Sequence, residues 1–256
     1  MSFYCGIRCR ACMQAHDYRR LVAGWRTLAR RSGFRMRAIA RTGGYTVYGI
    51  TTASPSAPAG GYVSAGIHGD EPAGVWALLR WAGKHRRRLA SREWVLLPCL
   101  NPWGLVANSR HDARGRDLNR SFHLRHLPLV RGWRAFVGRR RFAPPAVILH
   151  EDYDGDGIYA YSIGGDPAVA RRGIAAAGRV IGPSLNPSVD RKWRQDGGLV
   201  RLPHGLKPIR GVEAREVLAG HATSVTSLET PSETALELRV QAHAAYLDAV
   251  FATSHL

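Results

Sequence analysis

The sequence predicts an α/β fold, a three-layer sandwich in which helices flank a mixed, mostly parallel sheet. Short apolar runs typical of buried strands alternate with segments whose apolar residues recur at helical spacing. Polar residues that could carry chemistry follow the ends of several such runs, which is where ligands bind in open α/β sheets. With 256 residues, of which 45% are hydrophobic, the chain can bury a sizeable core. We expect a single domain over residues 1–256, with a helical lead-in over residues 1–34.

In the first hundred residues, apolar periodicity and turn residues define the expected elements. Six apolar residues at helical spacing precede Gly33, and Gly43-Gly44 joins two extended runs. Pro72 suits the first turn of a helix. The expected elements are a helix over 16–32, a hairpin of 36–40 and 45–51, a surface loop over 53–61, a buried strand over 62–67, a helix from Pro72, and a buried strand over 94–99.

The rest of the chain is less regular. Residues 105–128 are polar and rich in arginine, and a loop of this length inside a compact domain is usually functional. Residues 182–212 give no assignable pattern. Ser232 is the expected cap of the last helix. The remaining expected elements are strands over 146–150, 158–163 and 224–228 and helices over 167–181 and 232–251.

The chain is strongly basic, with a formal net charge of +18. All but Lys84, Lys192 and Lys207 of its 37 basic residues are arginine, a bias that often reflects a GC-rich genome rather than a partner. The runs 86–88 and 139–141 lack the aromatic company of an RNA-binding surface and the pattern of a DNA-reading module. We therefore expect a solvated basic surface and no specific nucleic-acid partner.

The cysteines and the apolar runs bear on cofactors and location. Cys5, Cys9 and Cys12 have a spacing that can hold an iron–sulfur cluster, but no barrel pattern follows them, so unpaired thiols in a reducing compartment are expected. No secretory signal and no run long enough to cross a bilayer is found. The sequence thus favours a cytoplasmic protein without membrane contact, although an incorrect start site would leave export open.

Two histidines and a glutamate indicate a metal site. His68 and Glu71 come from one tight turn after a buried strand, and His150 ends a distant strand. Two imidazoles and one carboxylate make the open three-ligand set of a catalytic zinc, with a fourth position for water. Alone, H-x-x-E is a weak motif, and Glu71 could simply be an acid favoured at a helix start.

Further motifs in a fixed order strengthen this interpretation. After H-x-x-E come Asn101-Pro102-Trp103-Gly104, then Arg110 ahead of Asp117-Leu118-Asn119-Arg120, then His150, and finally Glu229-Thr230-Pro231. Over residues 61–231 this set resembles the M14 metallocarboxypeptidases. The short form looks like bacterial members of that family and the related succinylglutamate desuccinylase/aspartoacylase branch.

The resemblance implies a role for each residue. His68, Glu71 and His150 would bind one zinc ion per chain, and Asp117 would orient His68. Glu229 would be the general base, and Arg110 would stabilise the oxyanion, with Arg114 and Arg116 as nearby competitors for that role. Asn119 and Arg120 would grip a substrate carboxylate.

Several alternatives stay open. Glu229 could cap the last helix together with Ser232, and Glu151 and Asp152 could support a ligand or hold a second metal. Asn101 and Gly104 are expected to be turn residues, and the stretch 154–157 is expected to be a turn rather than a calcium loop.

The sequence also departs from digestive carboxypeptidases. Asp70 stands where those enzymes carry a peptide-binding Arg, and residues 200–228 contain no Tyr that could cap the substrate. No residue can be assigned to the floor of a specificity pocket.

Three functions follow from these observations. The leading one is a zinc carboxypeptidase that hydrolyses an amide next to a free carboxylate, in short peptides. The second is an N-acyl amino-acid deacylase of the desuccinylase/aspartoacylase type. The third is a non-catalytic basic binding protein that kept the fold. The oligomeric state is not predicted.

Overall fold

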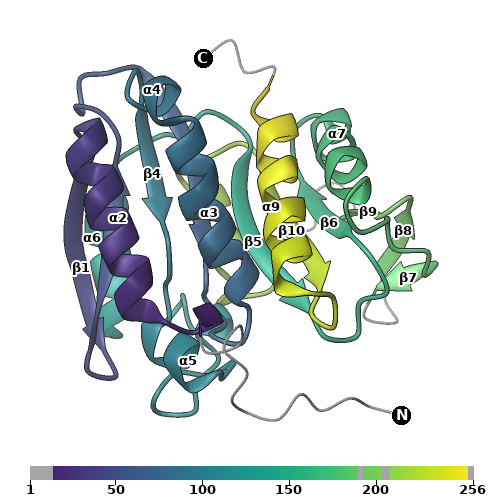
Figure 1. Ribbon diagram of the computed structural model, residues 1–256, viewed down its shortest axis with the longest axis horizontal. Helices are drawn as coiled ribbons and strands as arrows, with labels where there is room; N and C mark the ends of the chain where they lie inside the picture. The colour runs from purple at the N-terminus through teal and green to yellow at the C-terminus, as the bar shows by residue number, and fades with distance from the viewer. Residues whose placement is uncertain (1–13, 190–192, 203–207, 253–256) are drawn as a thin grey trace.

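The computed structural model describes residues 14–189, 193–202 and 208–252. Within them a single mixed sheet contains ten strands in the order β1-β2-β4-β3-β5-β10-β6-β9-β8-β7, with helices on both faces (Figure 1). The predicted fold class is confirmed. That the whole chain is one domain stays a prediction. Cys5, Cys9 and Cys12 lie outside the described residues.

The centre of the sheet is parallel and its margins are largely antiparallel. Strands β4, β3, β5 and β10 pair in parallel, so their carboxyl ends meet at one edge. The strands are β1 (Arg35–Thr42), β2 (Tyr45–Thr51), β3 (Ala59–Ala65), β4 (Glu93–Leu97), β5 (Ala146–Asp152), β6 (Tyr159–Ile163), β7 (Ser188–Val189), β8 (Trp193–Asp196), β9 (Leu199–Arg201) and β10 (Val225–Pro231).

Four helices cover the face of the sheet that is nearest the viewer in Figure 1. They are α2 (Tyr18–Ser32), α3 (Pro72–Lys84), α7 (Pro167–Gly178) and α9 (Leu236–Val250). Their apolar side chains, such as Trp25, Leu78 and Tyr246, form one buried cluster with alternate residues of the strands. Pro72 occupies the first turn of α3, as predicted.

A second buried cluster lies on the opposite face. There α6 (Pro128–Val137) and α8 (Glu213–Leu218) pack on the sheet through residues such as Trp133 and Val217. The remaining short helices are α4 (Arg86–Leu89), α5 (Pro102–Ala107) and the 3-10 turn η1 (Leu118–Arg120). The last two divide the segment that the sequence had suggested to be one long loop.

The last strand and the last helix differ from expectation at their junction. β10 runs on to Pro231, so Glu229 lies inside a strand and does not cap a helix. α9 begins at Leu236 with Ala235 at its N-cap, so the predicted cap at Ser232 is wrong. The four residues between Pro231 and Leu236 turn the chain before the helix can start.

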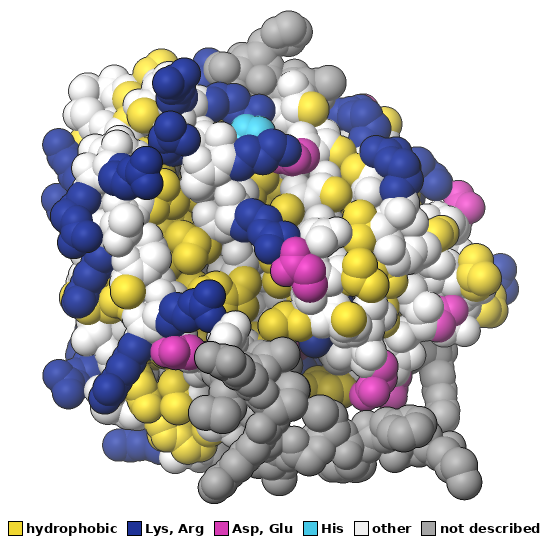
Figure 2. All heavy atoms as spheres, viewed as in Figure 1, with side chains coloured by type: hydrophobic (Ala, Val, Ile, Leu, Met, Phe, Trp, Pro, Cys, Tyr) yellow, Lys and Arg dark blue, Asp and Glu magenta, His cyan; other side chains and the backbone are white. Residues whose placement is uncertain are grey.

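Lys and Arg side chains are spread over the face shown in Figure 2, between uncharged and hydrophobic surface. No helix among the described residues is long and apolar enough to span a bilayer. These features do not test the prediction that the protein has no specific nucleic-acid partner.

Candidate metal centre and its cavity

Three elements bring His68, Glu71 and His150 together at the carboxyl edge of the sheet. His68 lies in the turn after β3, Glu71 is the N-cap residue of α3, and His150 lies near the end of β5. One nitrogen or oxygen atom from each residue can be chosen so that all three lie within 4.8 Å of one another, and all three residues are buried. The sequence had linked these residues through their places at strand ends, their types as metal ligands and the order of the motifs.

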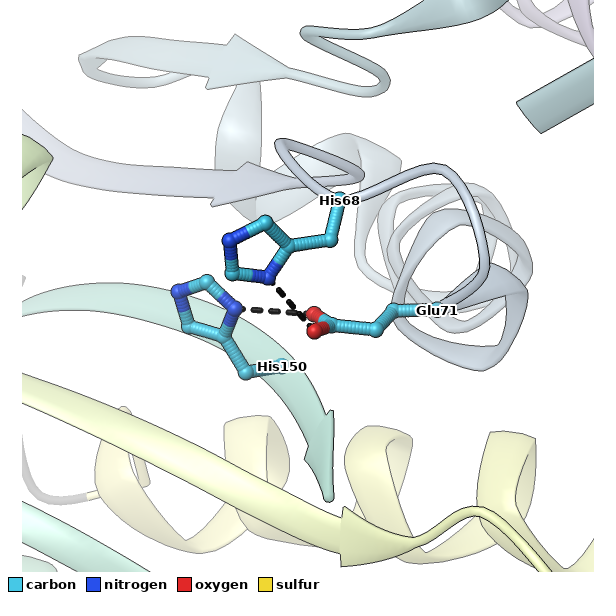
Figure 3. Close-up of side chains that lie close together, drawn as sticks. All are labelled: His68, Glu71 and His150. Carbon is cyan, nitrogen blue, oxygen red and sulfur yellow. Dashed lines mark hydrogen bonds and ion pairs between the residues drawn. The ribbon is translucent and has the colours of Figure 1, made fainter. Parts of the chain in front are cut away.

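Both imidazoles turn the same nitrogen toward the carboxylate of Glu71 (Figure 3). His68 Nδ1 lies 2.5 Å from Glu71 Oε1, and His150 Nδ1 lies 2.8 Å from Glu71 Oε2. Two ring nitrogens and one carboxylate thus converge on one point, which is the arrangement of donors that a metal cation requires.

Glu71 and the two imidazoles stabilise one another's charged forms, as the directions of their pKa shifts show. Burial alone would lower the pKa of His68, but Glu71 and Asp117 together outweigh it and raise the pKa to about 9. Burial likewise opposes ionisation of Glu71, yet the two imidazoles hold its pKa at about 2. Glu71 is therefore an ionised buried carboxylate that needs positive charge beside it.

Asp117 and Arg110 lie on the other side of His68. Asp117 Oδ1 is 3.3 Å from His68 Nε2, so the ring nitrogen that faces away from Glu71 has a carboxylate partner. Arg110 donates from Nε and Nη2 to Asp117 Oδ2 at 3.2 and 3.0 Å, and its Nη1 lies 3.3 Å from His68 Nδ1. A ligating imidazole held this way presents Nδ1 to a metal.

Of the three candidate arginines, Arg110 is the one that lines the cavity beside this cluster. Arg116 instead pairs with Asp112 at 2.6 Å, and the backbone nitrogen of Arg114 donates to the same carboxylate. Asp112 therefore closes a separate turn. For the oxyanion-stabilising role, the geometry favours Arg110 over Arg114 and Arg116.

Gly69 and Gly104, the last residue of the N-P-x-G motif, let the turn that holds His68 lie close to α5. A side chain at Gly69 would place its Cβ 1.9 Å from the carbonyl carbon of Gly104. Asn101 caps α5 by accepting from Gly104 N, and its Nδ2 donates to the carbonyl of His111. The N-P-x-G motif is thus a helix start that supports both His68 and the Arg110 segment.

Glu229 lies beside His150 on the neighbouring parallel strand, with the two Cα atoms in register. Burial, with the negative charges of Glu71 and Asp152, raises the pKa of Glu229 to about 8. A carboxylate of raised pKa next to a candidate metal cluster is a stronger base than an exposed glutamate.

Asn119 and Arg120 line the same cavity from the turn η1. Asp117 caps that turn by accepting from Asn119 N at 2.8 Å. Asn119 Oδ1 accepts from the backbone nitrogen of Glu213 at 3.0 Å, which leaves the amide nitrogen of Asn119 as a donor. The D-x-N-R motif therefore combines two roles: Asp117 contacts His68, and Asn119 and Arg120 present donors to the cavity.

Glu151 and Asp152 belong to other interactions. Glu151 accepts from Ala73 N in the first turn of α3 and is paired with Arg239 of α9. Asp152 accepts from the hydroxyl of Tyr159 and from Asp154 N. Among the described residues, the one cluster with metal-ligand spacing is His68, Glu71 and His150, so the second-metal alternative finds no support.

The cavity that contains these groups has a volume of about 360 Å³. Part of its lining comes from residues that the motifs do not include: Tyr159, Tyr161, Ile163, Trp193, Leu202, Pro208, Ile209, Val212, Ala214 and Ser227. The tyrosines alternate along the predicted strand 158–163, so a period of two could have indicated them. Residues 182–212 had no assignable pattern, and no signal there pointed to Trp193 or Ile209.

The residues present fit a zinc ion. The donors are the two imidazoles and one carboxylate of an open catalytic zinc site, both imidazoles direct Nδ1 to the same point, and His68 has a carboxylate behind it. The ligand, base and clamp assignments stay predictions.

Comparisons with known proteins agree with the sequence resemblance. Residues 61–142 match the model of the succinylglutamate desuccinylase/aspartoacylase catalytic domain family. No curated relative matches the chain in sequence.

Solved structures share the fold at low identity. A candidate metallopeptidase from Shewanella denitrificans is 20% identical with a TM-score of 0.80, over 93% of this chain and 90% of the other. Carboxypeptidase A from Helicoverpa armigera is 15% identical with a TM-score of 0.68, over 94% and 75%. A metallo-carboxypeptidase from Burkholderia cenocepacia is 17% identical with a TM-score of 0.66, over 92% and 68%.

These matches and the His–Glu–His cluster together support a metal-dependent hydrolase. The chain has the zinc carboxypeptidase-like fold of these structures, and its residues 61–142 match the succinylglutamate desuccinylase/aspartoacylase catalytic domain.

Proposed function

We propose that the protein is a zinc-dependent carboxypeptidase that hydrolyses the amide bond next to a free C-terminal carboxylate in short peptides. The observation that carries this proposal is the shared cavity. Its lining includes the candidate metal ligands His68, Glu71 and His150, which we call the metal cluster. It also includes Glu229 beside them and the donors of Arg110, Asn119 and Arg120. Each class of group is needed for a different part of amide hydrolysis.

A zinc ion held by His68, Glu71 and His150 would polarise the scissile carbonyl and make water more acidic. Glu229 accepts the proton of the attacking water and returns it to the leaving amine. A cation at the cluster lowers the pKa of Glu229 from its value of about 8, because a nearby positive charge favours the ionised carboxylate.

Arg110 donates from Nη1 to the oxygen on which negative charge develops. Its Nε and Nη2 are bonded to Asp117, so the guanidinium plane is fixed before substrate arrives. Asn119 and Arg120 hold the terminal carboxylate, for which the planar fork of arginine is suited. The amide to be cleaved then lies between this clamp and the metal cluster.

The test of this mechanism is Glu229→Gln. The variant should keep zinc, because Glu229 is not among the proposed ligands, and should lose about 10²–10⁴-fold in kcat, the usual contribution of a general acid–base group. The measurements are metal content by mass spectrometry and turnover of dipeptides whose N-terminus is blocked. Glu237→Gln, which changes a surface glutamate paired with Arg80, is the control and should be unaffected. Full activity in Glu229→Gln would remove Glu229 from the mechanism.

The second candidate is an N-acyl amino-acid deacylase, which the family match over residues 61–142 favours. The name of that family refers to N-acylated glutamate and aspartate as substrates. In a substrate of a carboxypeptidase, by contrast, the acyl group of the cleaved amide is the rest of a peptide. Release of free amino acid should be compared for dipeptides, N-succinyl amino acids and N-acetyl amino acids. Activity on the acyl compounds alone would reject the peptidase and leave the deacylase.

A further inference from the structure

On β5 and β10, the residues that follow His150 and Glu229 turn their side chains to the opposite face of the sheet. There α3 and α9 pack side by side (Figure 1). Successive side chains of a strand alternate between the two faces. Glu151 accordingly contacts α3 and α9, and Thr230 Oγ1 lies 3.1 Å from Nε2 of His243 in α9. The two strands are therefore tied by polar contacts to the helices behind them.

Glu151 connects three elements through one carboxylate. Its Oε1 accepts from the backbone nitrogen of Ala73 at 2.5 Å, and its Oε2 is paired with Arg239 of α9. The side chain of Glu151 is 0% exposed, so bulk water does not compete for either contact. Arg239 also donates from Nε to the carbonyl of Thr234 at 2.7 Å, in the turn before α9. The carboxylate is thus held in place between β5, α3 and α9.

The start of α3 explains what the contact with Ala73 does. Glu71 is the N-cap residue of α3, and an N-cap side chain usually accepts from the second or third N–H of its own helix. Glu71 makes no such bond, and its two oxygens instead face the two imidazoles of the metal cluster. Pro72, at the first position, has no N–H, so Ala73 carries the first N–H that needs an acceptor. Glu151 supplies that acceptor from another strand.

This exchange of roles matters because the carboxylate of Glu71 cannot serve both the helix and a metal. Ala73 is fully buried, and a buried N–H without an acceptor is costly. Without Glu151, the first turn of α3 would therefore draw the Glu71 carboxylate back toward its own helix and away from the imidazoles. With Ala73 satisfied, both oxygens of Glu71 stay at the metal cluster.

We propose that Glu151 is a positioning residue for the metal cluster: it caps α3 in place of Glu71 and so leaves the Glu71 carboxylate free to bind the metal. Arg239 holds Glu151 in the geometry that this cap requires. The inference rests on the proposed zinc site, because two of its ligands, Glu71 and His150, lie on the two elements that the cap joins.

Two double variants that differ in a single acceptor test this role. Glu151→Leu/Arg239→Met replaces the buried ion pair with apolar side chains of similar volume, an exchange that is often neutral or stabilising, and it leaves Ala73 N without its acceptor. Glu151→Gln/Arg239→Met removes the same charges but keeps an amide oxygen that can accept from Ala73 N. Zinc affinity is measured by chelator competition, at a temperature where circular dichroism shows each protein to be folded.

Glu151→Leu/Arg239→Met should bind zinc about 10–100-fold more weakly than wild type, the usual effect of losing a residue that orients a metal ligand. Glu151→Gln/Arg239→Met should keep most of the wild-type affinity, because its cap remains. A merely structural role would lower stability and leave the zinc affinity of the folded protein unchanged, so that result in Glu151→Leu/Arg239→Met would overturn the inference. Equal losses in the two double variants would also overturn it, since the ion pair and not the cap would then be responsible.

A single substitution decides the question if Glu151→Leu/Arg239→Met does not fold. Glu151→Asp keeps the charge beside Arg239, but its side chain is one methylene shorter and cannot reach Ala73 N in the same geometry. It should weaken zinc binding by at least about tenfold. Unchanged zinc affinity in folded Glu151→Asp would overturn the inference.

Thr230→Val is the matched control on the neighbouring strand. It removes the contact with His243 of α9 but does not affect the start of α3, so zinc affinity should stay at the wild-type value. A loss as large as that of Glu151→Asp would overturn the inference, because any polar contact behind the sheet would then have the same effect. If wild-type protein supplied with zinc bound none, the proposed metal site would be rejected and this inference with it, whereas zinc binding without these differences would reject only the cap.

Discussion

The two ends of the cavity are built in different ways. At the metal end, charged side chains contact one another: Glu71 contacts both imidazoles, and Asp117 contacts His68 and Arg110. At the other end, which we call the pocket end, lining residues such as Ile148 pack in the apolar cluster between the sheet and α8. The metal end therefore depends on the identity of each atom, while the pocket end depends on the volume of its side chains.

This difference has a consequence for substitution. A buried ionic cluster fails when one member is removed, because the remaining charges lose their partners. An apolar wall tolerates exchange among residues of similar volume. We expect catalysis to be lost by small changes at the metal end and to survive exchanges between side chains of similar volume at the pocket end.

The largest effect is expected for His68→Ala. It removes one of three proposed ligands, so zinc content should fall from about one per chain to none, and turnover should be abolished. The control is His111→Ala, which changes an exposed histidine in the Arg110 segment and should keep the metal. Metal content by mass spectrometry decides this prediction. A zinc-bound, active His68→Ala protein would mean that the cluster is not the metal site.

Asp117→Asn should have the next largest effect. Asparagine can still accept from Asn119 N and so cap η1, but the charge beside His68 and Arg110 is lost. Zinc affinity should fall by about 10–100-fold, as for other residues that orient ligating imidazoles. The measurement is competition with a chromophoric chelator. Asp112→Asn is the control, because Asp112 caps the neighbouring turn and pairs with Arg116. Equal losses in both variants would show that loop stability, not contact with His68, is responsible.

The same contrast explains what could be read from the sequence. The α/β architecture, the hairpin and the strands of the sheet centre were predictable, because buried strands and amphipathic helices leave periodic patterns. The cluster was predictable because His68 and Glu71 come from one tight turn, and because His150 and Glu229 each follow the carboxyl end of a predicted buried strand. Ionic and metal chemistry restricts which residue types can serve, and so it leaves motifs.

The pocket end could not be predicted for the opposite reason. Ser227, Ile148 and Tyr161 are ordinary strand residues, and only the register of three strands places them in one row. The short strands β7, β8 and β9 and the six-residue helix α8 are too brief to show periodicity. The late start of α9 at Leu236 was missed because Ser232 is a good cap in isolation, while β10 continues to Pro231.

Gly69→Ala tests whether backbone packing matters at the metal end as much as charge. The new Cβ would lie 1.9 Å from the carbonyl carbon of Gly104, and a backbone atom cannot rotate away. The loop that carries His68 must shift, so we expect a loss of about 1–3 kcal/mol in stability and weaker zinc binding. Thermal unfolding and chelator competition measure both.

The control for this substitution is Gly83→Ala in α3, where a Cβ would meet nothing within 4 Å. There the helix should gain about 0.5–1 kcal/mol, because alanine loses less backbone entropy than glycine on folding. Unchanged stability of Gly69→Ala would show that α5 can move away from the turn.

The smallest effect is expected for Glu213→Gln, beneath the pocket end. Glu213 is fully buried, it accepts from the hydroxyl of Tyr62, and burial raises its pKa. A carboxyl whose folded pKa is raised binds protons more readily in the folded state, so its ionisation reduces stability as pH rises above the unfolded value. Glutamine keeps an acceptor for Tyr62 and has no such ionisation. The melting temperature of Glu213→Gln minus that of wild type should therefore become more positive from pH 5 to pH 8.

The control, Glu216→Gln, loses a surface pair with Arg134 and should show no such rise. Parallel pH profiles for Glu213→Gln and wild type would mean that Glu213 is ionised in the folded protein, and the pocket end would then contain a buried charge like those of the metal end.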